Sequence, residues 1–168
     1  MAGRSGSVFI FERSGSEWVQ SAVLRQSLTS SQIQFGYSVD FSGEQLLVGT
    51  NLGDNTFGSG FAFLFEHDGS NWIQTGTLVS GYQDNHYGFG QSVSLSDGFA
   101  LVGAHLDIDN GQNAGAAFVF EQSGADWIQV AKLTALDGAE SDNFGIAVSL
   151  HGAQALIGAR RNGDGAGR

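Results

Sequence analysis

The chain has 168 residues, with 17 Asp and Glu against 7 Lys and Arg, and its formal net charge is −10. This acidic balance argues against nucleic acid as a partner, which needs clustered Lys and Arg, and against anionic membrane surfaces. The absence of Cys excludes disulfides and thiolate metal sites. No apolar run approaches membrane-spanning length, so we expect no membrane insertion. The first 15 residues lack the apolar core of a signal peptide, which leaves the compartment of the chain unknown.

Three segments of similar sequence make this chain a repeat array. Its landmarks are a Phe-Glu…Trp segment at 11–18, 65–72 and 120–127, a Phe-Gly pair at 35–36, 89–90 and 144–145, and a Val/Ile-Gly-Thr/Ala triplet at 48–50, 102–104 and 157–159. Every landmark steps by 54 and then by 55 residues. A period of about 50 with short strands is typical of propeller blades. We therefore expect residues 1–168 to form a single array, in which each unit buries its apolar faces against its neighbours.

In chain order, the strand-like runs predict the third and fourth strands of one blade, then two complete sets of four, then a first and a second strand at 144–159. The middle set has runs at 89–96, 99–104, 115–121 and 127–133, and a short Asp-Gly turn between the first two runs is a hairpin signal. No stretch keeps a 3.6-residue apolar period, so no long helix is expected. The sequence thus predicts an all-β protein of four-stranded antiparallel propeller blades, with two whole blades and two half-blades.

The third strand of each unit is apolar on both faces. In the first unit, Phe9 and Phe11 alternate with aliphatic residues. Burial on both faces is expected when sheets stack face to face, as propeller blades do. We expect Phe9, Phe63 and Phe118 to occupy equivalent buried positions. The repeated Trp and Phe-Gly residues are likewise expected to pack in the core.

These landmarks resemble the FG-GAP repeat, the unit of the integrin alpha-chain β-propeller and of many bacterial surface proteins. The Phe-Gly at 89–90 and the Gly-Ala at 103–104 carry the resemblance, and the stretch at 133–145 is closer to the bacterial members. The resemblance implies a β-propeller for protein–protein or adhesive contact, or a self-assembling scaffold derived from one, with an extracellular or cell-surface parent. Integrin repeats often hold Ca²⁺ between the first and second strands, but here these turns carry too few carboxylates. The turns are at 42–45, 96–98 and 151–154.

The densest polar cluster lies in the loop between the second and third strands of the middle unit. Asp107 and Asp109 alternate there and are followed by Asn110 and a Gly turn, a pattern of hard oxygen ligands that suits Ca²⁺. The equivalent loops carry weaker sets, at Asp54-Asn55 and at 162–164. Asn, Asp and Gly are also ordinary turn formers. The sequence therefore predicts weak Ca²⁺ binding or no cofactor.

Carboxylates also precede the last Phe-Gly pair, at Asp137, Glu140 and Asp142, where they could cap a turn or serve a glycosidase. They do not recur in the other units, no His pair has zinc-site spacing, and no nucleophile motif appears. Capping is favoured, and we expect a noncatalytic module. The alternative is a propeller enzyme, a lyase or glycosidase, with its site at the channel mouth. The Arg160-Arg161 pair is the strongest departure from repeat symmetry there.

Three blades cannot close a ring, because propellers have about four to eight. Ala-Gly-Arg occurs at 2–4 and again at 166–168, three repeats apart, so one copy would run in register into another. We expect a homodimer of six blades in which half-blades pair between chains. A fragment with open ends, or a slice of a larger propeller, is the alternative, and protein or glycan ligands are further candidate partners. The expected assembly residues are Val8, Phe9, Ile10, Phe11, Val148 and Leu150.

Overall fold

A computed structural model describes residues 6–26, 33–51, 60–81 and 86–161, and within these ranges every regular element is a β-strand. The first complete sheet contains β3 (Ser38–Ser42), β4 (Gln45–Gly49), β5 (Ala62–His67) and β6 (Trp72–Leu78), in that order. Each strand pairs antiparallel with the next one along the chain. This is the four-stranded antiparallel sheet that the repeat predicts.

The second complete sheet repeats the same order. It contains β7 (His86–Ser96), β8 (Phe99–Asp107), β9 (Ala116–Ser123) and β10 (Asp126–Leu133). Asp97 and Gly98 connect β7 to β8 with φ values of 48° and 78°, as a two-residue hairpin turn with positive φ at both positions requires. The predicted Asp-Gly hairpin is confirmed.

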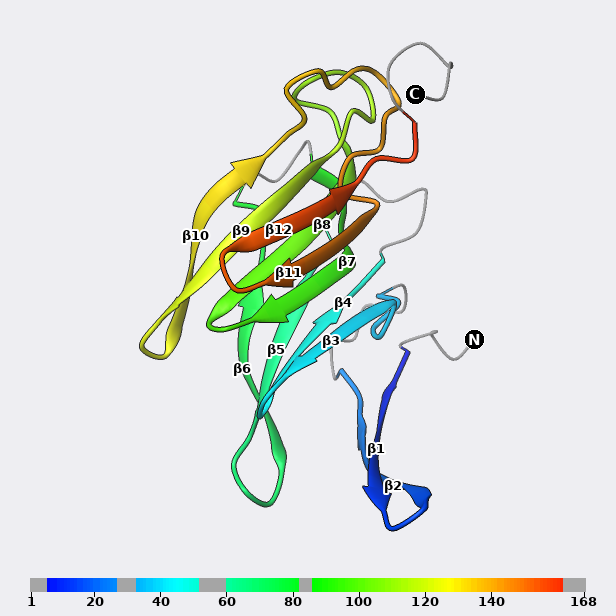
Figure 1. Ribbon diagram of the computed structural model, residues 1–168, viewed down its shortest axis with the longest axis vertical. Coiled ribbons are helices and arrows are strands. Elements are labelled where there is room, and N and C mark those ends of the chain that lie inside the picture. Colours follow the sequence, from blue (N-terminus) through cyan, green and yellow to red (C-terminus); the bar gives the residue numbers. More distant parts are fainter. Residues whose placement is uncertain (1–5, 27–32, 52–59, 82–85, 162–168) are drawn as a thin grey trace.

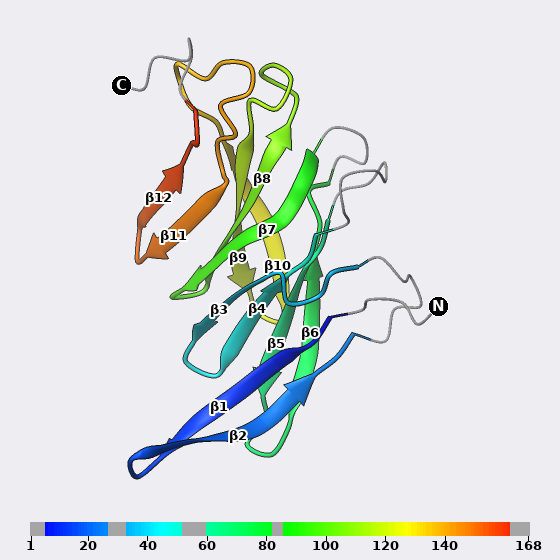
Figure 2. The same cartoon turned by 90° about the vertical axis from the view of Figure 1, so that its right-hand side faces the viewer.

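Two hairpins flank the complete sheets. The N-terminal hairpin is β1 (Val8–Ser14) with β2 (Glu17–Leu24), and the C-terminal hairpin is β11 (Ala147–His151) with β12 (Gln154–Gly158). The four sheets stack face to face in chain order, and the two hairpins lie at opposite ends of the stack (Figure 1, Figure 2). The architecture is all-β and consistent with propeller blades.

The outer pair of strands in each unit carries the same irregularity. Ser21, Thr75 and Val130 are each an extra residue in the fourth strand, where the pairing with the third strand shifts register. These positions are again 54 and 55 residues apart. A bulge of this kind bends the strand and increases its twist, so the repeat extends to the local shape of each sheet.

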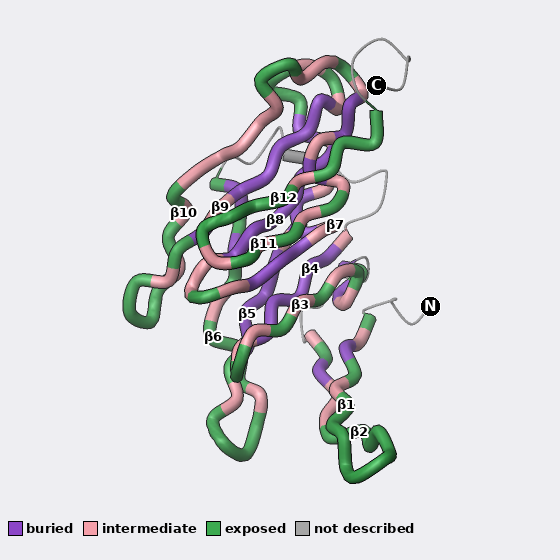
Figure 3. The backbone as a smooth tube through the Cα atoms, in the orientation of Figure 1, coloured by how far each residue is buried: buried purple, intermediate pink, exposed green. Residues whose placement is uncertain are grey.

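The core lies between sheets rather than within any one of them. One cluster joins the N-terminal hairpin to the first complete sheet, with Phe35, Phe63 and Phe65 at its centre. A second cluster joins the two complete sheets around Phe89 and Phe118. Buried residues follow the third and second strands of both complete sheets, while the two hairpins are largely exposed (Figure 3).

Phe63 and Phe118 are buried as expected, but the prediction for Phe9 is wrong, because its side chain is 55% exposed. Phe9 belongs to the β1–β2 hairpin, and no further sheet of the described residues lies beyond this hairpin at its end of the stack (Figure 2). Trp18 is exposed for the same reason, whereas Trp72 and Trp127 are half-buried and pack against the two clusters. Burial in this array depends on a neighbouring sheet, which the local sequence pattern does not report.

Candidate functional site

The contact between successive sheets is the most regular feature of the molecule and is built on glycine. Gly49 ends β4 of the first complete sheet, and a Cβ there would overlap the carbonyl oxygen of Gly90 in the second. A Cβ at Gly103 would in the same way overlap the carbonyl oxygen of Gly145. The second strand of one sheet therefore receives the Phe-Gly pair of the next sheet at a distance that only glycine allows.

A further row of glycines, just before the third strand of the preceding unit, contacts each Phe-Gly pair. A Cβ at Gly6, Gly60 or Gly115 would overlap the backbone carbonyl oxygen of the Phe in the neighbouring Phe-Gly pair. These are Phe35, Phe89 and Phe144, respectively. Two of these contacts are parallel bridges, Gly6 with Phe35 and Gly115 with Phe144. The repeated Phe-Gly thus has a structural reason beyond packing, because its backbone lies between two strands of the neighbouring sheet.

Hydrogen bonds along the first strands reinforce the contact between sheets. The Ser38 hydroxyl donates to the carbonyl oxygen of Gly90 at 2.8 Å, and the Ser92 hydroxyl donates to that of Gly145 at 2.7 Å. Two residues further along the first strands, the Asp40 carboxylate accepts a hydrogen bond from the Ser94 hydroxyl at 2.8 Å. The two serine bonds to glycine carbonyls repeat with the sheets, so they belong to the stacking itself.

The Ser94 hydroxyl also accepts the backbone N–H of Leu150 at 3.0 Å, in the C-terminal hairpin. Asp40 additionally accepts the backbone N–H of Leu95 at 2.7 Å. One line of polar contacts therefore crosses three successive sheets. It ends in the C-terminal hairpin, where Ser149, the repeat equivalent of Asp40 and Ser94, is exposed.

The C-terminal hairpin presents this same contact surface, and none of the described residues covers it. Leu156 is 75% exposed, although its repeat equivalents Leu47 and Leu101 are fully buried. Nothing lies closer than 3.6 Å to a Cβ built on Gly158, the equivalent of Gly49 and Gly103. The hairpin thus has a receiving surface of the kind that each complete sheet uses for its neighbour.

The first complete sheet presents the opposite half of the contact. Val39 is 53% exposed and Phe41 is 56% exposed, whereas their equivalents Val93 and Leu95 are buried in the cluster between the two complete sheets. Val93 and Leu95 share that cluster with Leu47. Two open surfaces therefore remain, and they correspond to the two sides of an internal joint.

The predicted assembly residues divide between covered and open faces. Phe9 and Phe11 are exposed, as an open end requires, but Val8 is buried and Ile10 packs against the cluster beneath the N-terminal hairpin. Val8 is therefore not on an open face, contrary to the sequence-based expectation. Val148 and Leu150 are half-buried on β11, which packs against β7 and β8.

Sequence reasoning missed four residues of the open surfaces, which are Val39, Phe41, Leu156 and Gly158. Their positions relative to the repeat landmarks carried a usable signal, because each is equivalent to a residue that lies between two complete sheets.

The predicted Ca²⁺ ligands lie beside a cation that the chain itself supplies. Asp107 is buried, and its carboxylate pairs with the Lys132 ammonium at 2.9 Å. Asp109 pairs with the same ammonium, and Asn110 is exposed. Lys132 also lies 5.4 Å from the centre of the Phe118 ring. Ca²⁺ binding at this loop stays a prediction, and a bound ion would compete with Lys132 for both carboxylates.

Within the described residues, no three His, Asp or Glu side chains gather closely enough to hold a metal ion. The weaker candidate loops at 54–55 and 162–164 lie outside the described residues. The Ala-Gly-Arg segments at the two ends of the chain lie outside them as well.

Asp142 caps a turn, as expected. It is buried, and its carboxylate accepts the backbone N–H of Ala139 at 2.7 Å. The neighbouring Asn143 has a φ of 57°. Its side-chain oxygen accepts a hydrogen bond from the Arg160 guanidinium at 3.0 Å, and its side-chain amide donates to the backbone carbonyl of His105 at 3.3 Å. Asp137 and Glu140 are exposed. These contacts give the loop before the last Phe-Gly pair a defined conformation.

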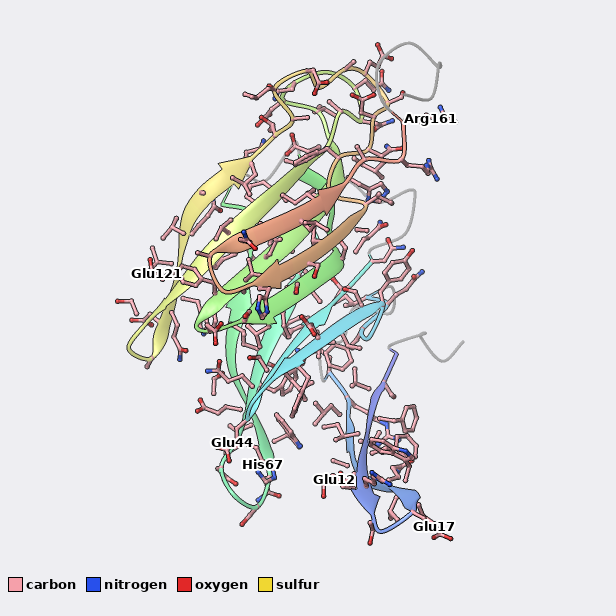
Figure 4. All side chains as sticks on the ribbon, viewed as in Figure 1. Glu12, Glu17, Glu44, His67, Glu121 and Arg161 are labelled. Atoms are coloured by element: carbon pink, nitrogen blue, oxygen red, sulfur yellow. The ribbon has the colours of Figure 1, made fainter. Side chains whose placement is uncertain are left out.

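Burial lowers the pKa of His105 below its ordinary value of 6.5, and the nearby charge of Arg160 lowers it further. His105 is the repeat equivalent of Arg160, so one position carries a neutral imidazole in one sheet and a guanidinium in the next. Arg161 lies at the opposite end of the molecule from Glu12, Glu17 and Glu44, which are near the hairpin turns (Figure 4).

Four stacked antiparallel sheets with repeated glycine contacts define a propeller-type repeat protein. The model of the FG-GAP repeat matches residues 72–120 and 127–168, together more than half of the chain. The chain belongs to the FG-GAP repeat family, as the sequence resemblance implies. The two matches begin at the equivalent residues Trp72 and Trp127. Comparison with curated proteins finds no match.

No helix formed by the described residues is long and apolar enough to cross a membrane.

Proposed function

We propose that this chain is a noncatalytic propeller module that acts through protein contact, and that its first partner is a second copy, with which it closes a six-bladed ring. One observation carries the proposal. The two open surfaces of the chain are the two halves of the contact that its own sheets make inside the molecule.

The match between the two surfaces is specific. The receiving side, with Leu156 and Gly158, has the same residue types in the same positions as Leu47 and Gly49. The entering side offers Val39 and Phe41 where the internal joint uses Val93 and Leu95. A second copy therefore supplies each open surface with a partner whose shape the chain already accommodates.

The number of sheets in each copy supports a particular size for the proposed assembly. Two complete sheets and two half-sheets amount to three blades in each copy. Closed propellers have about four to eight blades, and within that range only six is a multiple of three. Two copies related by a two-fold axis meet this condition, and the two joints of the ring are then identical.

Burial of apolar surface favours the ring. Each Å² removed from water contributes about 25 cal/mol, against an association cost of roughly 4–15 kcal/mol that is met once for two joints. Each copy carries a net charge of −10, so repulsion between copies opposes assembly. Salt at about 0.15 M shortens the range of that repulsion to about 8 Å. We therefore expect association to strengthen with ionic strength.

The noncatalytic part of the proposal rests on how the best acidic candidates are used. Asp142 caps a turn and Asp107 pairs with Lys132, so both have structural partners. Screening on polysaccharides and esters should detect no turnover. Reproducible turnover that is lost in the Asp142→Asn variant would favour the enzyme alternative instead.

Sedimentation equilibrium over a range of concentrations tests the self-association. The expected mass is about twice 17.6 kDa. A folded monomer at high micromolar concentration would contradict the ring, and so would a mass that keeps rising with concentration, because open head-to-tail arrays do not saturate.

A further inference from the structure

The open edge of β12 and the open edge of β1 are complementary strand edges. Among the described strands, each of these two pairs with a single neighbour, because β1 pairs with β2 and β12 pairs with β11. In the complete sheets, the equivalent strands pair with each other, as β4 with β5 and β8 with β9. An unpaired edge is a template for a further strand.

We propose that β12 of one copy adds to β1 of a second copy in one register, which makes a composite four-stranded sheet, and that Gly158 then receives the Phe-Gly pair at 35–36 of that second copy. The proposal rests on the proposed function, since it specifies how the two copies join.

The register follows from the two complete sheets, which agree with each other. Gln45 pairs with Glu66 and Phe99 with Glu121 at one end of the second and third strands. At the other end, the pairs are Gly49 with Ala62 and Gly103 with Ala117. The same pairing applied to the equivalent residues of β12 and β1 gives the expected pairs between copies. They are Gln154 with Glu12, Ala155 with Phe11, Leu156 with Ile10, Ile157 with Phe9, and Gly158 with Val8.

Side-chain types in this register reproduce those inside the chain. Ile157 lies opposite Phe9 in this register, as the β-branched Val102 lies opposite Phe118 inside the chain. Ala155 opposite Phe11 repeats the pairing of Ala100 with Phe120. Pairs of this kind stabilise a sheet through cross-strand contact. A shift by one residue would place every side chain on the wrong face.

Among the described residues, the Phe-Gly pair at 35–36 makes one of its two expected contacts. A Cβ on Gly36 would meet the backbone oxygen of Ser7 at 3.0 Å, on the side of the third strand. On the other side, Gly90 and Gly145 approach the backbone N of Thr50 and of Ala104, while the nearest atoms to Gly36 include none from a second strand. The composite sheet supplies that missing strand.

Disulfide trapping tests the register directly, because the chain contains no Cys. The variant Glu12→Cys with Gln154→Cys places a thiol on each side of the joint, at exposed positions. The two strands lie at opposite ends of the stack, so a bond within one copy is excluded (Figure 2). Oxidation should convert most of the protein into a covalent dimer that reductant returns to monomer.

The matched control moves one thiol by two residues on the same strand face, in Ser14→Cys with Gln154→Cys. Diagonal positions on paired strands are about 7–8 Å apart, beyond the usual Cα separation of a disulfide. We expect at least tenfold less covalent dimer under the same conditions. Equal or greater trapping in the control would overturn the register.

Gly158→Ala tests the receiving position without a probe group. A methyl group there has room in the single chain, so the folded spectrum and the unfolding midpoint of the dilute protein should not change. In the composite sheet it would overlap the carbonyl oxygen of Gly36, as a Cβ at Gly49 or Gly103 would overlap its neighbour. We expect association to weaken by at least tenfold.

The outcomes separate the two proposals. If the parent protein is a dimer but the Cys pair does not trap and Gly158→Ala leaves the mass unchanged, the copies join through another face. The inference then fails while the proposed self-association stands. If the parent is a monomer, both fail.

Discussion

The joint between the second complete sheet and the C-terminal hairpin and the free surface of that hairpin are built from equivalent residues of the repeat, yet only the joint is buried. Gly103 receives the Phe-Gly pair at 144–145, while no Phe-Gly pair of the described residues approaches Gly158. Leu101 is fully buried, while Leu156 is exposed. The comparison shows that a unit of this array has no fixed burial pattern of its own, because its environment comes from its neighbours.

The largest expected difference is between the two glycines. Gly103→Ala should destabilise the folded chain by about 3 kcal/mol or more, because the added methyl meets backbone atoms that side-chain rotation does not relieve. Gly158→Ala should leave the fold unchanged. Urea unfolding of both variants at low concentration measures the contrast. Equal losses would mean that residue 158 is not an open equivalent of residue 103.

The equivalent leucines give a second contrast. Leu101→Ala should cost about 2–5 kcal/mol of unfolding free energy, since it empties a buried site. Leu156→Ala should change the stability of the dilute chain by less than about 0.5 kcal/mol, as surface substitutions usually do. The same variant should weaken association in sedimentation experiments. A large loss of monomer stability in Leu156→Ala would show that this side chain is already packed.

Lys132 offers a test within a complete sheet that should leave the joints intact. Lys132→Met removes the ammonium that pairs with Asp107 and Asp109, and the buried Asp107 charge then lacks its main partner. We expect the unfolding free energy to fall by about 2–4 kcal/mol at neutral pH, because a broken buried pair leaves an uncompensated charge.

Calorimetry with Ca²⁺ on the parent and on Asp107→Ala tests the weak cation binding separately, and tight binding in both would place a site elsewhere.

The sequence predicted the elements of the fold well, because three copies report each strand and turn. The turn at 97–98 and the buried Phe63 and Phe118 are examples. The exposure of Phe9 was not predicted, since the same local pattern is buried elsewhere. The pairing of Lys132 with Asp107 was also missed, because it joins different strands and has no counterpart in the other units that the sequence could reveal.

A smaller effect should come from restoring a hydrogen bond at the free surface. Ser38 and Ser92 donate to the Phe-Gly pair of the next sheet, but Ala147 occupies the equivalent position on β11. Ala147→Ser should therefore strengthen association by about 1 kcal/mol, the usual net contribution of one hydrogen bond, and leave the dilute chain unaffected. Unchanged association would indicate that β11 does not face a Phe-Gly pair in the assembly.

The smallest effect concerns pH. Burial lowers the pKa of His105 in the folded chain, which favours the neutral side chain. Below about pH 6.5, the unfolded chain therefore binds a proton at this residue more readily than the folded chain does. Stability from this group is present above that pH and declines as the pH falls. His105→Gln should flatten the dependence of unfolding free energy between about pH 7 and 5. An identical slope in the parent and the variant would contradict the burial argument.

Amide hydrogen exchange in β12 tests the central claim most directly. Among the described strands, β12 bonds only to β11, so in a single chain we expect the amides at 154–158 that face away from β11 to exchange rapidly. At concentrations where the assembly forms, the account predicts protection along the whole of β12, comparable with that of β4 and β8. Rapid exchange of the outward amides of β12 at those concentrations would contradict it.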